Sequence, residues 1–257
     1  MQFTNFEKGC IDLLLETKSR GKHCFRSAVD HLKKGWALRQ IDPNMAVFRA
    51  ITAEEEAASG LIYAIKQRLH IDSEKLDPRN HRHKSAVVPF IQILGMHFKE
   101  IVKAHDMQPI LHLREADGYL PKHLGIGLKV KIAGVEKIAY PIPPLNLRTT
   151  ISGLVPSYKP QMHELLQKAG ASSVRQYIKG LANLRNTILY ASADGIPTIE
   201  DLSDDFFINR KKRVMAMLNA YLLIEPYEEI QPFVQDAVHA FVAMLEMNQS
   251  IQLYPET

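Results

Sequence analysis

Residues 41–72, IDPNMAVFRAITAEEEAASGLIYAIKQRLHID, carry the clearest helical pattern in the chain. Asp42 can cap the start of a helix, and Pro43 suits the first helical position. Apolar residues then recur at spacings of three and four along one stripe: Val47, Ala50, Ile51, Ala57, Ala58, Leu61, Ile62, Ile65 and Leu69. A helix of about seven turns with alanines on its apolar side predicts a helical bundle whose neighbouring helices approach closely.

Further helical patterns lie on both sides of this segment. They cover residues 6–17, 25–38 and 85–105 in the first part of the chain, and 159–170, 171–192, 199–224 and 228–248 in the last part. Gly170 is expected to end one helix, and Ser172 or Ser173 to begin the next. Pro89 is tolerable in a helix if it lies in the first turns.

The pattern changes over residues 109–153, which are rich in Gly and Pro. Leu128, Val130 and Ile132 alternate with lysines, which predicts a strand with one buried face. The sequence AGVE can turn this strand back into KIAYPI. We therefore expect a mainly α protein with a small antiparallel β insertion. Residues 1–108 and 154–257 would form one helical bundle, interrupted by the insertion at 109–153.

The composition is that of a soluble globular protein, with 46% hydrophobic and 23% charged residues in 257. The net charge of +4 permits an anionic partner, but any nucleic-acid site must then be local. The two cysteines, Cys10 and Cys24, suggest buried thiols in a reducing compartment rather than a disulfide. Neither a signal peptide nor a membrane helix is expected, so we predict a cytoplasmic protein.

Sequence motifs of phosphate-binding loops, zinc peptidases, serine hydrolases and dinucleotide-binding domains do not occur. Eleven histidines raise the possibility of a metal site, but neither the pair His81 and His83 nor the pair His97 and His105 comes with Cys or carboxylate ligands at a defined spacing. We therefore expect neither a metal nor a cofactor.

Three charged clusters each allow two interpretations. The glutamates at 54–56 point in three directions on a helix, so at least one should face inward; they either form a solvated edge, or Glu54 or Glu55 orients a cation from a neighbouring helix. Residues 209–213, NRKKR, are expected to form a solvated face. The denser cluster PRNHRHK either starts a helix without further function or binds phosphates through Arg79, His81, Arg82, His83 and Lys84.

The segment LRNTILY, residues 184–190, places polar residues beside an apolar stripe. On a continuous helix, Arg185, Asn186 and Tyr190 lie near one side, and pointing into one cleft they could hold a phosphodiester. Arg185 would supply charge, Asn186 orientation, and Tyr190 a proton donor or acceptor. The alternative is a helix end with an arginine near its C-terminus and a tyrosine that fills the core.

LRNTILY resembles the signature of HEPN domains, which are helical bundles with an Arg-polar motif that ends in His. The resemblance is nearest to abortive-infection proteins of the AbiV type, through VFRAITAEEEAASGLIYAIK, HRHK and LYASADGIPTIEDL, and it covers residues 22–105 and 172–246. It implies a homodimer whose motif residues line a cleft, and many members cut RNA without a metal. Arg185 and Asn186 match the first motif positions, but Tyr190 replaces the His.

This replacement matters because a phenol titrates near pH 10 and is a poor base at neutral pH. The site would then bind RNA without cleaving it, or take a histidine from elsewhere, such as His81 or His83. The leading hypothesis is an RNA-binding protein, and a metal-independent ribonuclease if a histidine completes the site, in phage defence or a toxin-type system. The alternatives are a non-enzymatic protein that acts through protein partners, with the insertion as docking element, and a metal-dependent hydrolase.

Overall fold

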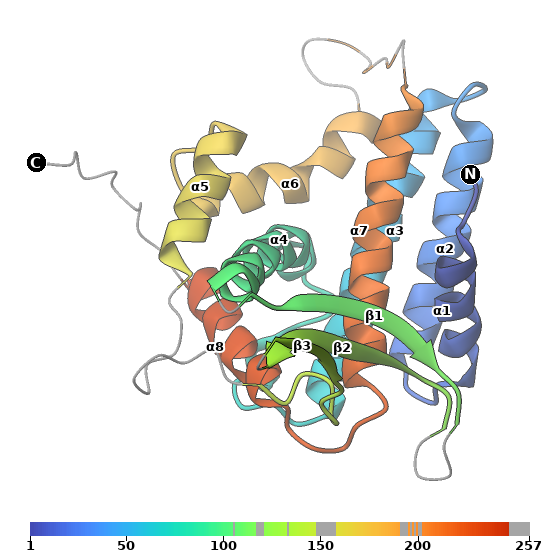
Figure 1. Cartoon of the computed structure of the whole chain (residues 1–257). Helices are drawn as coiled ribbons and strands as arrows, with labels where there is room; N and C mark the ends of the chain where they lie inside the picture. The colour runs from blue at the N-terminus through green and yellow to red at the C-terminus, as the bar shows by residue number, and fades with distance from the viewer. Residues whose placement is uncertain are drawn as a thin grey trace, which may run out of the picture.

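The computed structural model describes residues 1–104, 106–116, 121–132, 134–147, 158–190, 195, 197, 199 and 202–246. Helices dominate, and the elements in chain order are α1 (Asn5–Glu16), α2 (Gly21–Leu38), α3 (Pro43–Gln67), the short 3-10 helix η1 (Ser73–Lys75), α4 (His81–Ala104), β1 (Gln108–Arg114), β2 (His123–Ile132), β3 (Val135–Ala139), α5 (Lys159–Ala169), α6 (Val174–Leu189), α7 (Asp204–Ile224) and α8 (Pro232–Glu246). The eight α-helices of the described residues and one small antiparallel sheet confirm the mainly α architecture (Figure 1).

Helix α3 lies at the centre of the bundle. Its first turn is capped as expected, because the side chain of Asp42 accepts a hydrogen bond of 3.0 Å from the backbone N–H of Met45. Helices α2, α4, α6 and α7 all contact α3. Small residues permit the close approach of α2, since a Cβ on Gly21 would lie 2.7 Å from the carbonyl oxygen of Gly60. With neighbours on several sides, α3 buries far more than a single stripe.

The N- and C-terminal parts of the chain pack into one core. Tyr221 on α7 is buried, and its hydroxyl lies 2.9 Å from the Thr17 hydroxyl and 2.6 Å from the Ser19 hydroxyl, between α1 and α2. The hydroxyl group of a buried tyrosine needs such partners. Gly170 ends α5 with a φ of +62°, and Ser173 caps α6, so both predicted helix boundaries are confirmed.

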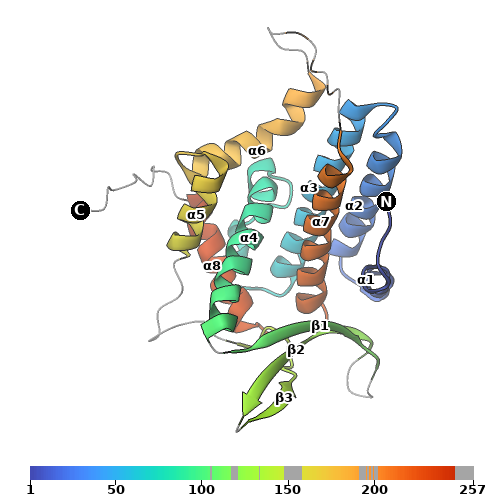
Figure 2. The same cartoon turned by 45° about the horizontal axis from the view of Figure 1, so that its top comes forward.

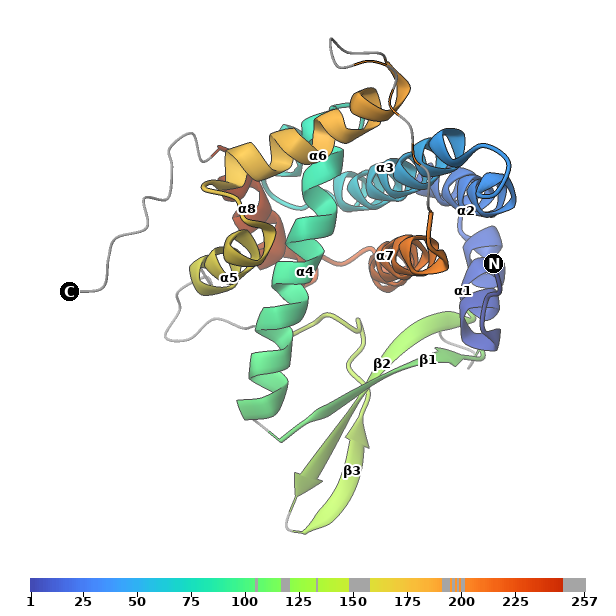
Figure 3. The same ribbon diagram turned by 90° about the horizontal axis from the view of Figure 1, so that it is seen from above.

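The sheet has the order β1-β2-β3, with both pairs antiparallel. The predicted turn after Ile132 is confirmed, with Gly134 at a φ of +81°, where glycine is favoured. Of the apolar side chains of β2, Leu124 and Ile126 are buried, because the strand begins at His123 and its first half packs on the helices. Leu128, from the predicted set, is half-buried and packs against the core, and Val130 is half-buried as well. The β2–β3 hairpin projects away from the helical body (Figures 2 and 3).

Helix α4 departs from the sequence-based expectations in two ways. Pro89 is its ninth residue and lies in the helix interior, not in the first turns. The helix is also long and apolar enough to cross a membrane by length and composition alone, which the sequence did not lead us to expect. Mostly buried core helices of soluble proteins meet the same criterion; α4 contacts α3, α5, α6, α7 and α8, and 28% of its apolar stretch is buried.

Buried histidines make the stability of this fold depend on pH. His70 is 1% exposed, and burial lowers its pKa below the ordinary 6.5; burial also lowers the pKa of His97. Below pH 6.5 the unfolded chain takes up protons that the folded chain does not, so the free energy of unfolding falls as the pH falls. The slope is at most about 1.4 kcal/mol per pH unit for each such histidine.

We therefore expect the melting temperature to fall by several degrees between pH 7 and pH 5. His70→Gln should reduce this dependence on pH, whereas the same change at the exposed His23 should leave it as it is. Melting curves at half-unit pH steps measure the slope. Equal slopes for the wild type and His70→Gln would show that another group is responsible.

Candidate anion-binding groove

Two adjacent glutamates on α3 both face the interior. Glu54 is 9% and Glu55 6% exposed, while Glu56 is half-buried. Successive side chains on a helix diverge by about 100°. Glu54 and Glu55 can nevertheless both be buried, because α3 has helices on several sides. Burial raises the pKa of Glu56 above its usual range. Buried carboxylates require charged or hydrogen-bonding partners, and Glu54 and Glu55 each have them.

Glu55 is the meeting point of three basic side chains. Its Oε1 lies 3.2 Å from His81 Nδ1, and its Oε2 lies 3.5 Å from Lys84 Nζ and 3.6 Å from Arg185 Nη1. The Lys84 side chain is only 10% exposed, while that of Arg185 is 30% exposed. Two basic segments that are about 100 residues apart in the sequence, at the start of α4 and the end of α6, therefore meet on one carboxylate of α3.

Glu54, like Glu55, pairs with basic side chains, in this case two arginines of α7. It accepts a hydrogen bond from Arg210 and a second, of 3.3 Å, from Arg213 Nη1. The prediction that residues 209–213 form a solvated face was wrong for Arg210 and Lys211, whereas Asn209 and Lys212 are exposed. Lys211 is also largely buried and lies 2.9 Å from Glu7 on α1. The reason is that α7 packs against α1, α2, α3 and α4, so its basic run faces acidic groups of its neighbours.

The other members of the 79–84 cluster point elsewhere. Arg82 donates a hydrogen bond of 2.6 Å to the carbonyl of Leu245 at the end of α8. His83 Nδ1 accepts a hydrogen bond of 3.0 Å from the backbone of Asp77, and burial lowers the pKa of this imidazole. Arg79 is exposed. Of the five predicted RNA-binding residues, His81 and Lys84 thus reach the cluster around Glu55.

The predicted set of Arg185, Asn186 and Tyr190 is not gathered in one cleft of this chain. Helix α6 ends at Leu189, and Tyr190 follows in an extended conformation, with 66% of its surface exposed. Asn186 is exposed as well. The expectation that Tyr190 shares a helical side with Asn186 fails because the helix does not continue. Ile188, by contrast, packs with Val47 and Ile51 and holds this end of α6 on α3.

A pocket of about 230 Å³ opens beside the glutamates, between α3, α4, α6 and α7. It is lined by Ile51, Glu54, Glu55, Lys84, Ser85, Val88, Pro89, Gln92, Tyr177, Leu181, Leu184, Arg210 and Arg213. Together with Arg185 and His81 on Glu55, these residues form what we call the α3 groove. Four basic side chains, Lys84, Arg185, Arg210 and Arg213, pair with two carboxylates, Glu54 and Glu55, in it. The α3 groove therefore has an excess of positive charge suited to an anion.

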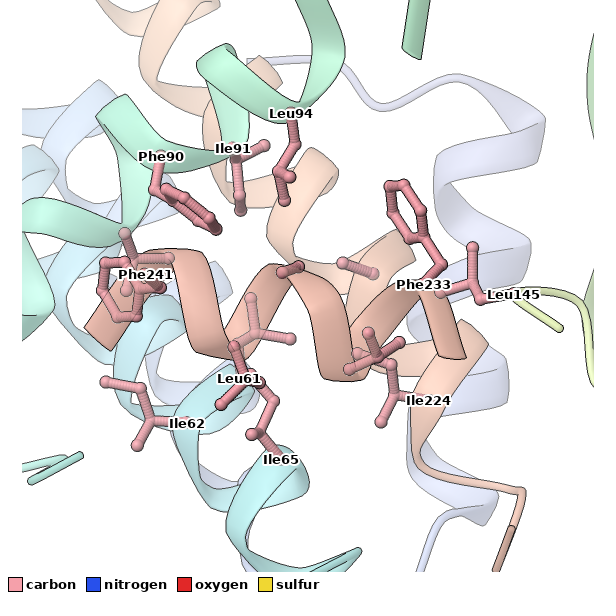
Figure 4. A pocket seen from close by; sticks show the side chains of 15 residues that line it. Leu61, Ile62, Ile65, Phe90, Ile91, Leu94, Leu145, Ile224, Phe233 and Phe241 are labelled. Atoms are coloured by element: carbon pink, nitrogen blue, oxygen red, sulfur yellow. The ribbon is translucent and has the colours of Figure 1, made fainter. Parts of the chain in front are cut away.

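A second pocket, of about 100 Å³, lies between α3, α4, α7 and α8 (Figure 4). All of its 15 lining side chains are apolar, among them Leu61, Phe90, Phe233 and Phe241. It offers no charged or polar group to orient a substrate, so we do not place the functional site there. Among the described residues, no three His, Cys, Asp or Glu side chains gather as metal ligands.

The cysteines do not contribute a reactive group. Both are free, and burial raises the pKa of the Cys10 and Cys24 thiols to about 11. Only the thiolate is an effective nucleophile, and at neutral pH these groups remain thiols. Neither cysteine therefore supplies a nucleophile to the α3 groove.

Sequence reasoning missed Arg210 and Arg213, and it left the role of Glu55 open. Two signals were available: the run of three glutamates, which required at least one inward-facing carboxylate, and the basic run at residues 209–213. Comparisons of the chain with protein-family models, with curated proteins and with solved structures found no match.

Proposed function

We propose that the protein binds RNA through the α3 groove, as a HEPN-like helical bundle of the abortive-infection type. One observation carries the proposal: Lys84 and Arg185, from two segments that resemble the HEPN pattern, contact the same buried carboxylate. The excess of cations over carboxylates supports an anionic ligand. A phosphodiester can compete with Glu55 for these cations, and the guanidinium of Arg185 can bind two phosphate oxygens at once.

The proposal includes a homodimer. Asn186 and Tyr190 are exposed at the end of α6, where a second copy of the chain or bound RNA can reach them. In the HEPN arrangement, the motif residues of two subunits face a shared cleft. Residues that are dispersed in one chain would then act together across the two-fold axis, with Asn186 contacting ribose or phosphate oxygens.

His81 is the residue to which we assign acid–base chemistry in RNA cleavage. Imidazole titrates closest to neutral pH among the side chains, and the Nδ1 of His81 lies 3.2 Å from Glu55 Oε1. The carboxylate can orient the ring. His83 is unsuited to this role because its Nδ1 accepts a backbone hydrogen bond and burial lowers its pKa. Cleavage of cellular RNA would give the protein a role in phage defence or as a toxin.

The proposal is tested with purified wild type, His81→Ala and the control His23→Ala, incubated with cellular RNA in the presence of a chelator. We expect the wild type and His23→Ala to bind and cleave RNA. His81→Ala should still bind RNA, but its rate of cleavage should fall at least a hundredfold. Cleavage by His81→Ala at the wild-type rate would contradict the assignment of His81. A wild type that binds no RNA at any salt concentration would contradict the proposed function.

A protein-docking function of the insertion is the second candidate. The observation that favours it is the set of exposed apolar side chains on the sheet and just after it: Leu111, Val135, Ile138, Tyr140 and Ile142. Deleting residues 109–153 would also remove Leu124 and Ile126 from the core, so Ile138→Lys is the cleaner variant. A docking function predicts that the activity of the protein in the cell is abolished by Ile138→Lys and retained in Arg185→Ala. The RNA-binding proposal predicts that this activity is abolished by Arg185→Ala and retained in Ile138→Lys.

A further inference from the structure

We propose that the pocket of the α3 groove accepts one unpaired nucleobase of the bound RNA, next to the phosphate held by Arg185 and Lys84. This inference rests on the proposed function and specifies its substrate as single-stranded RNA. The lining of the pocket is of two kinds. Ile51, Val88, Leu181 and Leu184 are apolar, whereas Glu54, Glu55, Lys84, Arg210 and Arg213 are charged. A flat ring with apolar faces and a polar edge can contact both kinds of side chain.

Pro89 removes one helical hydrogen bond beside this pocket. Proline has no N–H, so within α4 the carbonyl oxygen of Ser85, four residues earlier, receives no helical hydrogen bond from position 89. Ser85 and Pro89 both line the pocket. A proline in a helix interior is costly, and here it provides a carbonyl that can accept a hydrogen bond from the amino or imino group of a base.

Two further lining residues offer contacts suited to a base. Gln92, one turn after Val88 on α4, is exposed, and its amide can both donate and accept hydrogen bonds. Tyr177 on α6 is half-buried and provides an aromatic ring that contributes to the lining. Bases that leave the stack are typically held by aromatic side chains and by hydrogen bonds to their edges.

The size of the pocket limits what can enter. Sites for drug-sized ligands occupy about 300–1,000 Å³, so a pocket of about 230 Å³ corresponds to a smaller unit such as a single heterocycle. A base in a duplex would have to leave its stack at a cost of a few kcal/mol. The pocket therefore favours single-stranded RNA.

Calorimetric titration with AMP, UMP and ribose 5-phosphate tests the inference, because ribose 5-phosphate has the phosphate and the sugar but no base. We expect the wild type to bind at least one nucleotide tenfold or more tightly than ribose 5-phosphate. Val88→Trp on α4, or Leu181→Trp on α6, should fill the pocket and remove the difference. Val102→Trp, on the same helix but outside the pocket lining, should retain it.

The outcomes separate this inference from the proposed function. Equal affinity of the wild type for nucleotides and ribose 5-phosphate, with RNA still bound, would overturn the base pocket and leave the phosphate site intact. A preference that survives in both pocket-filling variants would also overturn it. Absence of RNA binding by the wild type would contradict the proposed function, and the base pocket with it. Melting curves of each variant show that a lost preference is not a lost fold.

Discussion

Glu55→Ala is expected to lower the free energy of unfolding by about 3–5 kcal/mol, the usual cost of removing one partner from a buried ion pair. Glu55 is 6% exposed, and the Lys84 side chain is only 10% exposed, so the variant leaves an ammonium group inside the protein without its counter-ion. Arg185 loses the same partner but is more exposed and can reach water. Urea denaturation, followed by far-UV circular dichroism, measures the change.

Glu56→Ala is the matched control on the same helix. Burial already raises the pKa of Glu56, which means that its charged form is disfavoured in the fold. Its replacement should therefore cost less than about 1 kcal/mol, within the range of ordinary partly exposed sites. The double variant Glu55→Ala/Lys84→Met should recover more than half of the lost stability, because no buried charge then lacks a partner. A loss below 1 kcal/mol for Glu55→Ala would show that the cluster around Glu55 is not structurally important.

Arg185→Ala is expected to weaken the binding of single-stranded RNA by about tenfold to a hundredfold, as for a hydrogen bond to a charged group worth about 1.5–3 kcal/mol. One phosphate contact fewer should also reduce the slope of log K against log salt concentration by about 0.7. Fluorescence anisotropy with a labelled oligoribonucleotide, measured at several salt concentrations, gives both quantities. The fold should be retained, because the Arg185 side chain is 30% exposed.

Arg175→Ala, in the first turn of the same helix, controls for the loss of a positive charge. Arg175 is exposed and lies at the opposite end of α6 from Arg185. We expect its replacement to change the affinity by less than twofold at moderate salt. Equal losses in the two variants would mean that RNA responds to the overall charge of α6 and not to a site at Arg185.

The local features of the helices could be predicted from the sequence. Asp42 and Pro43 begin α3, and Gly170 ends α5, because caps depend on residues within one turn. Helical periodicity also required that at least one residue of the triplet Glu54–Glu56 face inward. These predictions use only the geometry of one helix, and the structure confirms them.

The partners of Glu54 and Glu55 could not be predicted in this way. Glu54 and Arg210 are 156 residues apart in sequence, and Glu55 and Arg185 are brought together by the packing of α6 on α3. Periodicity shows which side of a helix is covered but not which helix covers it. For the same reason, residues 209–213 were expected to be solvated, although Arg210 and Lys211 are largely buried.

The end of α6 shows a second reason why the candidate site could not be predicted from the sequence. A pattern of residues at 185, 186 and 190 indicates one side of a helix only if the helix continues through all three. The structure ends α6 one residue before Tyr190 and turns the backbone into an extended conformation. Helix ends are the least predictable part of an element, so a motif that crosses one has no defined geometry before the structure is known.

A double-mutant cycle of RNA affinity tests the central claim most directly, that Arg185 and Lys84 form one phosphate site. Wild type, Arg185→Ala, Lys84→Ala and the double variant are titrated with the same single-stranded oligoribonucleotide in the presence of a chelator. Residues that share a ligand are coupled by about 0.5–3 kcal/mol. We therefore expect the double variant to bind no more than about threefold more weakly than Arg185→Ala alone. The claim would be contradicted if the losses of binding free energy in the two single variants added in full in the double variant. Absence of salt-dependent RNA binding by the wild type would also contradict it.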